Sequence, residues 1–283
     1  MNKDLWIRDF EKKVLKTIKD YKLLNKKDKV LVACSGGKDS TTVLYLLKKF
    51  GYWVEGLMID LLIGSWSQRN LDNVKSFCQQ EKIKLHVVSV REVLGGSMCY
   101  LRSKIGADQK LKTCTVCGVI KRWLLNKKSQ ELGVDKIVTG HNLDDQAETM
   151  LMNFLKNNIG LNLGQRPKTG VIKNKKFIPR IKPLFFCLNE DVRKYSELME
   201  FPVLYDKCPC SSGVFRREIR EELDQLEKNH PDFKDNLVRN FLQISPKIKL
   251  EEKKVVYCEK CGEVSRNKIC KFCSLMKTLE KFK

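Results

Sequence analysis

Short apolar runs alternate with stretches of helical periodicity through the first part of the chain. Four runs, at residues 30–34, 54–60, 85–90 and 136–140, are rich in Val, Ile and Leu and have the length of buried strands. This alternation predicts an α/β fold, a doubly wound parallel sheet with helices on both faces. The helices are expected where apolar residues recur every three or four positions, at 39–50, 68–81, 116–132 and 143–157.

Helical patterns also flank the predicted sheet. Residues 4–24 carry apolar side chains at helical spacing, which predicts an amphipathic helix packed on the main domain. Residues 188–242 have a helical pattern, with breaks at Pro202 and Pro231. We therefore expect four regions: an N-terminal helix at 1–27, an α/β domain at 28–187, a small helical unit at 188–250 and a cysteine-rich tail at 251–283.

A glycine-containing turn joins the first strand to the following helix and reads Ser-Gly-Gly-Lys-Asp-Ser over residues 35–40. The first N–H groups of a helix lack intrahelical partners and lie at the positive end of its dipole, so such a turn is suited to phosphate. An ordinary turn with a solvated lysine is the alternative. Because ligands bind beyond the carboxyl ends of parallel strands, we expect nucleotide contacts from Ser35, Gly36, Gly37, Lys38, Asp39, Ser40, Asp60 and Gly140.

Four cysteines near the C-terminus form two turn-spaced pairs, Cys258 with Cys261 and Cys270 with Cys273. Each pair can hold one side of a tetrahedral ion, which predicts a structural zinc site. A segment with so few large apolar residues gains its folding free energy from the metal. A rubredoxin-like iron site and unliganded thiols are the alternatives, and such a knuckle could also bind RNA.

The chain carries 55 Lys and Arg residues against 34 acidic residues, a net charge of +21. This excess fits a polyanionic partner such as nucleic acid, although lysine-rich solvated faces are common. No acidic residue occurs between residues 158 and 186. We expect this segment to be a loop that contacts RNA phosphates through Arg166, Lys168, Lys173, Lys175, Lys176, Arg180 and Lys182.

No run approaches the length of a membrane span and no leader is visible, so we expect a cytoplasmic protein without a membrane partner. Twelve cysteines in such a chain favour metal ligands or reactive thiols over disulfides. Some of them lie in apolar or helical contexts and are expected to be small buried side chains, namely Cys34, Cys78, Cys99 and Cys187.

A second cysteine motif lies in the middle of the chain. Cys114 and Cys117 precede Lys121, which shares a helix face with Cys117 because the two are four residues apart. Alone, this pair could be redox-active, half of a zinc site or buried packing. Cys208 and Cys210 flank a proline far downstream. Three thiolates at one place would hold an iron–sulfur cluster and leave one iron without a protein ligand.

These motifs resemble those of a known family. The turn at 35–40 resembles the PP-loop, SGGxDS, of the N-type ATP pyrophosphatases. The sequences CTVCGVIKR at 114–122, GHNLDDQAET at 140–149 and Cys-Pro at 208–209 resemble the TtcA/TtuA/Ncs6 family of tRNA thiolation enzymes. With the tail knuckle, the resemblance extends over roughly residues 28–275.

The resemblance implies an ATP-dependent tRNA sulfurtransferase. A uridine or cytidine carbonyl oxygen attacks the α-phosphorus of ATP, pyrophosphate leaves, and sulfur replaces the adenylated oxygen to give a 2-thionucleoside. A [4Fe-4S] cluster on Cys114, Cys117 and Cys208 would present the sulfur, with a cysteine persulfide as the competing route, and Lys121 and Asp145 would be catalytic. Mg²⁺ would assist at the phosphates and Zn²⁺ would bind the tail. Sulfide or a ubiquitin-like thiocarboxylate carrier would supply the sulfur, and related enzymes often form homodimers.

Local alternatives remain for four residues. Asp39 could be only a helix cap, and Asp60 could bind ribose or merely end a strand. Asp145 at a helix start could be a cap, and a lone His141 in a turn is more often a structural hydrogen bonder than a base. The chain departs from the family in three ways: residues 1–28 contain no cysteine, Leu61-Leu62 follow the second strand, and Cys210 follows Cys-Pro. Cys210 is therefore an alternative ligand, a resolving thiol or a bystander.

Two rival functions retain part of the motif set. One is a PP-loop enzyme that activates its substrate with ATP but uses another nucleophile, as in lysidine formation. The other is a non-catalytic module that binds RNA or carries sulfur.

Overall fold

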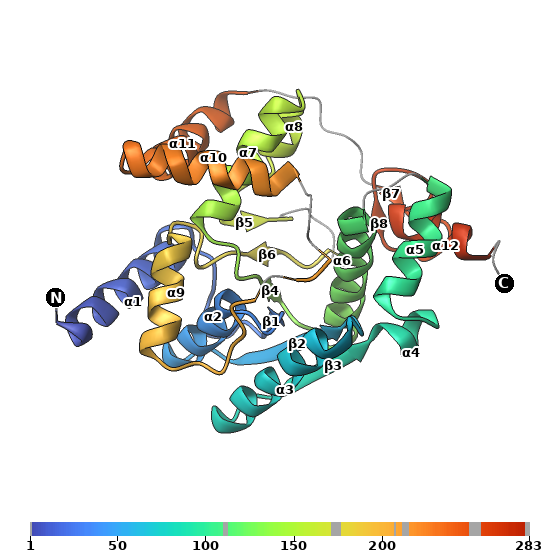
Figure 1. Cartoon of the computed structure of the whole chain (residues 1–283), viewed down its shortest axis with the longest axis horizontal. Coiled ribbons are helices and arrows are strands. Elements are labelled where there is room, and N and C mark those ends of the chain that lie inside the picture. Colours follow the sequence, from blue (N-terminus) through green and yellow to red (C-terminus); the bar gives the residue numbers. More distant parts are fainter. Residues whose placement is uncertain are drawn as a thin grey trace.

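The computed structural model describes residues 2–109, 113–170, 177–206, 208–210, 215–248 and 256–280. A central sheet has the strand order β3-β2-β1-β4-β6-β5 (Figure 1). Neighbouring strands are parallel except β5 and β6, which are antiparallel. The predicted doubly wound sheet is therefore confirmed. The strands are β1 (Val30–Cys34), β2 (Val54–Asp60), β3 (Leu85–Ser89), β4 (Lys136–Val138), β5 (Lys168–Thr169) and β6 (Arg180–Ile181).

Helices cover both faces of this sheet. On one face, four helices share an apolar core with β1 and β2. Phe10 of the N-terminal helix stacks on Tyr195 with 4.7 Å between the ring centres. Phe10, Val14 and Ile18 share the core with β1, so the predicted amphipathic helix does pack on the main domain. The four helices are α1 (Lys3–Asp20), α2 (Lys38–Lys49), α3 (Gly64–Gln80) and α9 (Asn189–Leu198).

The opposite face is covered by α6 (Thr113–Glu131), whose Leu125 packs against Leu31 and Ile137 of the sheet. The short helix α4 (Val90–Leu94) and α5 (Met98–Gln109) precede it. Helices α5 and α6 also share a core with a C-terminal ribbon, which therefore lies beside them (Figure 1). The ribbon consists of the antiparallel strands β7 (Val256–Tyr257) and β8 (Val264–Ser265) and of α12 (Lys271–Glu280).

A third core joins α7 with two later helices at the carboxyl edge of the sheet. The buried ammonium group of Lys234 donates to Asp144 Oδ1 at 2.6 Å, and Asp144 Oδ2 accepts from the backbone N–H of Asn189 at 2.6 Å. One carboxylate at the start of α7 thus ties α9 and α11 to this edge. The elements are α7 (Leu143–Leu155), α8 (Ile159–Asn162), α10 (Phe215–Asn229), α11 (Phe233–Ile244) and the 3-10 turn η1 (Ser245–Lys247).

Several expectations need correction. The helices at 90–109 were not predicted, because their apolar residues do not follow one clear stripe. The segment 158–186 is not simply a loop, since it contains α8 and the strand pair β5–β6. Residues 201–206 belong to neither helix nor strand, so the region 188–242 is not helical throughout. In the ranges given above, no helix has the length and apolar character needed to cross a bilayer.

Candidate active site and metal centre

The turn at 35–40 leaves β1 and enters α2 with free N–H groups. Gly37 is the N-cap of α2, and no side chain caps it. Among the described residues, no acceptor is found for the N–H groups of Lys38, Asp39 and Ser40. Ser40 Oγ accepts from the N–H of Ser35 at 3.1 Å and donates to Gly37 O at 3.0 Å, which fixes the shape of the turn. This helix start can bind an anion such as a phosphate.

Two glycines allow other elements to approach this turn closely. Gly36 has a φ of +82°, and a Cβ there would lie 2.4 Å from Asn70 Oδ1 of α3. Gly140 follows β4, and a Cβ there would lie 2.8 Å from the backbone nitrogen of Ser40. A side chain at position 140 would therefore cover one of the free N–H groups. Both positions require glycine.

Lys38 is directed toward protein groups in this structure. Its Nζ donates to Asp39 Oδ1 at 2.8 Å and to Asn189 Oδ1 at 2.7 Å, and its side chain is 13% exposed. Asp39 Oδ1 also accepts from Asn142 Nδ2 at 2.9 Å. Lys38 and Asp39 thus connect the turn to the starts of α7 and α9. A phosphate would have to compete with Asp39 for the ammonium group.

Asp145 both caps α7 and faces cations. It forms a capping box with Asn142, in which each side chain accepts the backbone N–H of the other residue at 3.1 Å. Asp145 Oδ2 is the acceptor in the box, whereas Oδ1 lies 3.6 Å from Arg220 Nη2 and 4.0 Å from Arg216 Nη1. Both arginines also pair with the buried Glu148, whose pKa is raised by burial. One oxygen of Asp145 therefore acts as a helix cap, which was the alternative given above, and the other oxygen faces α10.

Lys182 is a buried cation beside these groups. It was expected to contact RNA, but it is 8% exposed, and its Nζ donates to Gln146 Oε1 at 2.9 Å and to Gln165 Oε1 at 3.2 Å. Burial lowers its pKa to about 8, although the charge of Asp145 acts in the opposite direction. The side chain follows β6 and is enclosed by α7 and by the segment before β5, so it does not face solvent as an RNA contact would.

Asp60 and His141 make local contacts. Asp60 Oδ1 accepts the N–H of Leu62 at 3.0 Å, directly after β2. His141 is exposed, and its Nδ1 lies 2.8 Å from Thr139 Oγ1. These contacts correspond to the strand-end alternative for Asp60 and to the structural alternative for His141.

Cys114, Cys117 and Cys208 come from two distant segments, and Cys117 interacts electrostatically with each of the other two. Cys114 and Cys117 lie in the first turns of α6, and Cys117 and Cys208 are half-buried against the same apolar core. Burial raises the pKa of Cys117, while the nearby Lys121 lowers it. Cys114 Sγ lies 3.9 Å from the carbonyl oxygen of Cys210. Three cysteine donors supported by cationic groups fit the ligand set of an iron–sulfur cluster.

Cys99 and Arg102 extend this group, and nothing in the sequence pattern indicated either. Cys99 was expected to be buried but is exposed, because Met98 and Leu101 occupy the buried face of α5. Burial lowers the pKa of Arg102, but its hydrogen bond with the Cys210 thiol raises it, and the net shift is upward. The Cys-Pro-Cys spacing was the signal that singled out Cys210. The other three cysteines expected to be buried are so: Cys34, Cys78 and Cys187.

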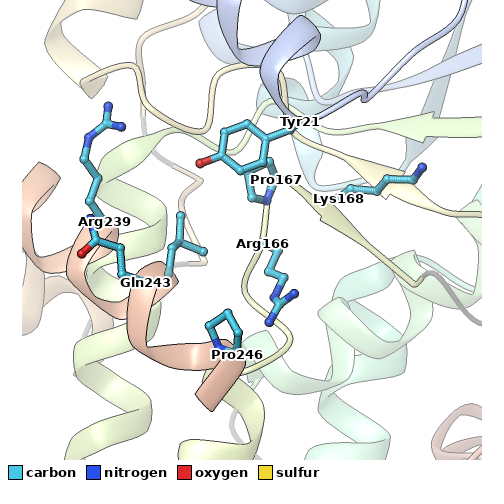
Figure 2. A pocket seen from close by; sticks show the side chains of 8 residues that line it. Tyr21, Arg166, Pro167, Lys168, Arg239, Gln243 and Pro246 are labelled. Atoms are coloured by element: carbon cyan, nitrogen blue, oxygen red, sulfur yellow. The ribbon is translucent and has the colours of Figure 1, made fainter. Parts of the chain in front are cut away.

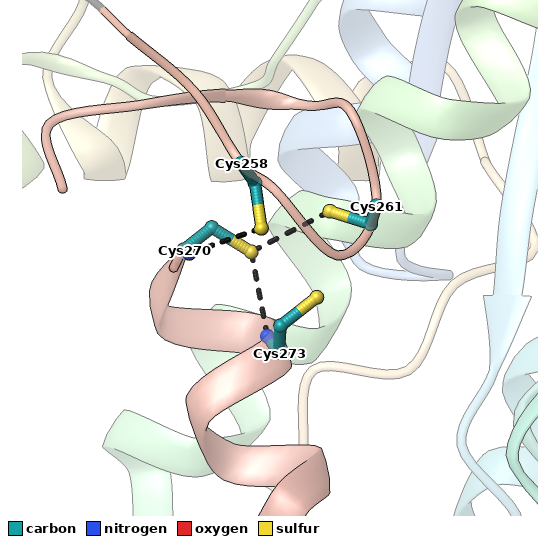
Figure 3. Close-up of side chains that lie close together, drawn as sticks. All are labelled: Cys258, Cys261, Cys270 and Cys273. Carbon is teal, nitrogen blue, oxygen red and sulfur yellow. Dashed lines mark hydrogen bonds between the residues drawn. The ribbon is translucent and has the colours of Figure 1, made fainter. Parts of the chain in front are cut away.

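The four tail cysteines converge in the ribbon. The Sγ atoms of Cys258, Cys261, Cys270 and Cys273 all lie within 4.8 Å of one another (Figure 3). The backbone N–H of Cys270 donates to Cys258 Sγ at 3.2 Å, and that of Cys273 donates to Cys270 Sγ at 3.3 Å. N–H donors aimed at sulfur stabilise thiolates. Four thiolates in this arrangement fit a structural metal ion with tetrahedral coordination.

The ribbon supports the helix that carries Cys117. Phe272 of α12 stacks on Trp123 of α6 with 3.8 Å between the ring centres and 6° between the planes. The buried Glu263 accepts hydrogen bonds from the side-chain amides of Asn126 and Gln130 of α6. The ribbon therefore packs against the same helix that carries Cys114 and Cys117.

The basic residues of segment 158–186 have different environments. Arg166 is exposed and Lys168 is half-buried. Arg180 is turned inward, and burial together with the neighbouring Arg122 lowers its pKa to about 10. The remaining predicted RNA contacts, Lys173, Lys175 and Lys176, lie outside the described residues.

Comparison with known proteins places the chain among tRNA-modifying enzymes. The PP-loop domain profile matches residues 7–227. The tRNA-5-methyluridine(54) 2-sulfurtransferase of Pyrococcus horikoshii is 36% identical over 270 residues, which cover 93% of this chain and 83% of that protein. Cytoplasmic tRNA 2-thiolation protein 1 of Caenorhabditis elegans is 33% identical over 278 residues, 96% of this chain and 73% of that protein.

A solved structure is similar over nearly the whole chain. The U34-tRNA thiolase NcsA of Methanococcus maripaludis, determined with its [4Fe-4S] cluster, has a TM-score of 0.82 and 31% identity, and the match covers 99% of this chain and 90% of that one. The profile match and the identities over most of each relative agree with the motifs described above. The chain therefore belongs to the TtcA/TtuA/Ncs6 family of PP-loop tRNA thiolation enzymes.

Proposed function

We propose that the protein is an ATP-dependent sulfurtransferase that adenylates a carbonyl oxygen of a tRNA uridine or cytidine and replaces it with sulfur. The observation that carries the proposal is a common edge of the sheet. The free N–H groups follow β1, and Leu61 and Ile63 follow the adjacent β2 and pack in the same core as Cys117 and Cys208. A nucleotide on the turn and a base activated beside it would then be near the thiols.

The turn is the proposed phosphate site. N–H groups at the start of α2 would stabilise negative charge that develops on the α-phosphate as pyrophosphate leaves. Lys121 is exposed on the face of α6 that carries Cys117, and its ammonium group would add to this stabilisation. Oδ1 of Asp145 would orient Mg²⁺ or the nucleotide while Oδ2 holds the start of α7.

Cys114, Cys117 and Cys208 are the proposed ligands of a [4Fe-4S] cluster, which would supply an iron open to a sulfur atom. The cysteines would hold that group at the edge where the activated base is bound. Cys258, Cys261, Cys270 and Cys273 are the proposed ligands of Zn²⁺. We further propose that sulfide or a thiocarboxylate carrier protein supplies the sulfur, that the enzyme acts in the cytoplasm, and that it forms a homodimer.

The test is a reconstitution under anaerobic conditions with unmodified tRNA, ATP, Mg²⁺ and sulfide, followed by mass spectrometry of the digested nucleosides. A new thionucleoside is expected and would also identify the base. Pyrophosphate release with all base oxygen retained would indicate a different nucleophile or a need for a protein sulfur donor. No pyrophosphate release despite tight tRNA binding would contradict an enzymatic role.

A further inference from the structure

A basic pocket lies apart from the phosphate turn (residues 35–40) and from the cysteine group (Cys114, Cys117 and Cys208). It has a volume of about 440 Å³ and lies between the end of α1, the segment that leads into β5, and the corner between α11 and η1 (Figure 2). Pro167, Leu242 and Pro246 supply apolar walls. The polar lining consists of Tyr21, Arg166, Lys168, Arg239 and Gln243.

The lining contains three cations and no carboxylate. Arg239 pairs with Asp235, which does not line the pocket. Across the described ranges, neither Arg166 nor Lys168 has a carboxylate partner, and Arg166 Nη2 is 3.4 Å from the hydroxyl of Ser245. Cations that lack a protein counter-charge at the rim of a pocket favour phosphate groups.

Tyr21 adds an aromatic surface beside these cations. Its ring centre lies 5.4 Å from that of Phe186, and the residue is still 40% exposed. The Arg239 guanidinium lies 4.4 Å from the centre of the same Phe186 ring. Because Phe186 is buried, it holds the tyrosine ring and the arginine in a fixed relation. An ordered aromatic ring beside cations is the arrangement on which single-stranded nucleotides stack.

We propose that this pocket binds one unstacked nucleotide of the tRNA substrate, with its base on Tyr21 and the flanking phosphates on Arg166 and Lys168. The inference rests on the proposed function. No residue of the phosphate turn or of the cysteine group lines the pocket, so the bound nucleotide is one other than the base that reacts. The pocket is connected to the surroundings of Asp145 through Gln165, which is next to Arg166 and accepts a hydrogen bond from Lys182.

The test compares two double variants that remove the same charges. Arg166→Gln/Lys168→Gln alters the pocket, and Arg69→Gln/Lys75→Gln alters exposed residues of α3, which contributes no residue to the pocket. Affinity for unmodified tRNA is measured at several salt concentrations, with melting curves to verify folding. We expect the pocket variant to bind tRNA about tenfold more weakly. The slope of log affinity against log salt concentration should become shallower by about 0.7 to 0.9 for each phosphate contact that is lost. The α3 variant should change affinity by less than about twofold.

Tyr21 provides an independent arm of the same test. Tyr21→Ala should weaken tRNA binding about tenfold without changing the salt dependence, whereas Tyr21→Phe should bind like the wild type, because stacking needs the ring and not the hydroxyl. The single variants of Tyr21 and the pocket double variant address different groups of the nucleotide. A fold defect in one therefore leaves the other informative.

Each other outcome overturns the inference. Unchanged affinity in the pocket variants, or equal losses in the pocket and α3 variants, would exclude a nucleotide site here, while thionucleoside formation by the wild type would still support the proposed function. Normal tRNA binding with loss of activity only when a thiocarboxylated carrier replaces sulfide would assign the pocket to an acidic protein tail. A wild-type protein that does not bind tRNA would contradict the proposed function itself.

Discussion

Gly36 and Asn70 are in such close contact that a Cβ on Gly36 would lie 2.4 Å from Asn70 Oδ1. Asn70 is 2% exposed, and its Nδ2 donates to Trp66 O at 2.8 Å, so it has little room to move aside. The shape of the phosphate turn therefore depends on α3 as well as on the turn itself.

Gly36→Ala is expected to abolish ATP binding and lower the melting temperature. The new Cβ would overlap Asn70 in addition to the strain of about 1 kcal/mol that any L-residue bears in this backbone region. Gly95→Ala is the matched control, because Gly95 has a φ of +78° but no atom within 4 Å of its Cβ position. Calorimetric titration with ATP and thermal melting provide the measurements. Equal effects of the two substitutions would show that the contact with Asn70 is unimportant.

Cys208→Ala should abolish thiolation and reduce the iron and labile sulfide content of anaerobically prepared protein, with tRNA affinity intact. Cys210→Ala is the comparison, since Cys210 is two residues away and half-buried in the same core. It should retain the iron. The reverse result would make Cys210 the ligand, and full activity of Cys208→Ala would remove that residue from the site.

Asp145→Asn should decrease the rate of thiolation by about 100-fold or more while changing stability by less than about 1 kcal/mol. Asparagine keeps an oxygen for the capping box but loses the negative charge that faces Arg216 and Arg220. Asp4→Asn removes a carboxylate from the first turn of α1 and serves as the control. Single-turnover assays and melting curves separate the two effects. A normal rate would leave Asp145 with a capping role alone.

Cys270→Ser should release one metal ion per chain and unfold the ribbon, since structural zinc contributes on the order of 10 kcal/mol to the folding of such segments. Unfolding of the ribbon would separate Phe272 from Trp123 and expose the indole to water, so tryptophan fluorescence can report the event. Cys187→Ser alters a buried thiol outside the cluster and should keep the metal. Metal analysis measures both variants, and retention of the ion by Cys270→Ser would contradict the assigned ligand set.

Lys182→Met should increase the free energy of unfolding at pH 7. Burial lowers the pKa of Lys182 from 10.5 to about 8 in the folded protein. Between pH 8 and pH 10.5 the unfolded chain therefore binds more protons than the folded one, and stability rises with pH across that window. The charged form costs about 3 kcal/mol at pH 7, partly offset by its hydrogen bonds to Gln146 and Gln165.

Urea denaturation at pH 7 and pH 10 tests this expectation. The advantage of the methionine variant should shrink at pH 10, where the buried lysine is already neutral. Lys127→Met, at an exposed position of α6, should have little effect at either pH. An advantage that does not depend on pH would mean that packing, and not charge, is responsible.

Local patterns predicted the parts of this molecule that depend on neighbouring residues. The runs at 30–34 and 54–60 are β1 and β2 as predicted, because central parallel strands are buried on both faces. The convergence of Cys258, Cys261, Cys270 and Cys273 was also predicted, because the members of each pair are only three residues apart and the two pairs lie close together in the sequence. The division into regions at 27, 187 and 250 stays a prediction.

Other features depend on contacts between remote segments. Arg216 and Arg220 reach Asp145 from a helix about 70 residues away, and no short-range pattern marks such a pair. The burial of Lys182 depends on Gln146 and Gln165, which come from α7 and from the segment before β5. Basic composition predicted a contact with RNA phosphates there, whereas the two glutamines enclose the lysine.

The bond between Lys38 and Asp39 has a consequence for turnover. Asp39 already forms an ion pair with the ammonium group of Lys38 that an incoming phosphate would attract. Phosphate binding at Lys38 would therefore exchange one anion for another. The free energy of binding at this residue is then a difference between two similar attractions. Release of a bound phosphate would leave no bare charge at Lys38, because Asp39 could pair with its ammonium group again. If the turn binds ATP as proposed, the carboxylate that weakens its hold on the nucleotide would also assist the departure of the products.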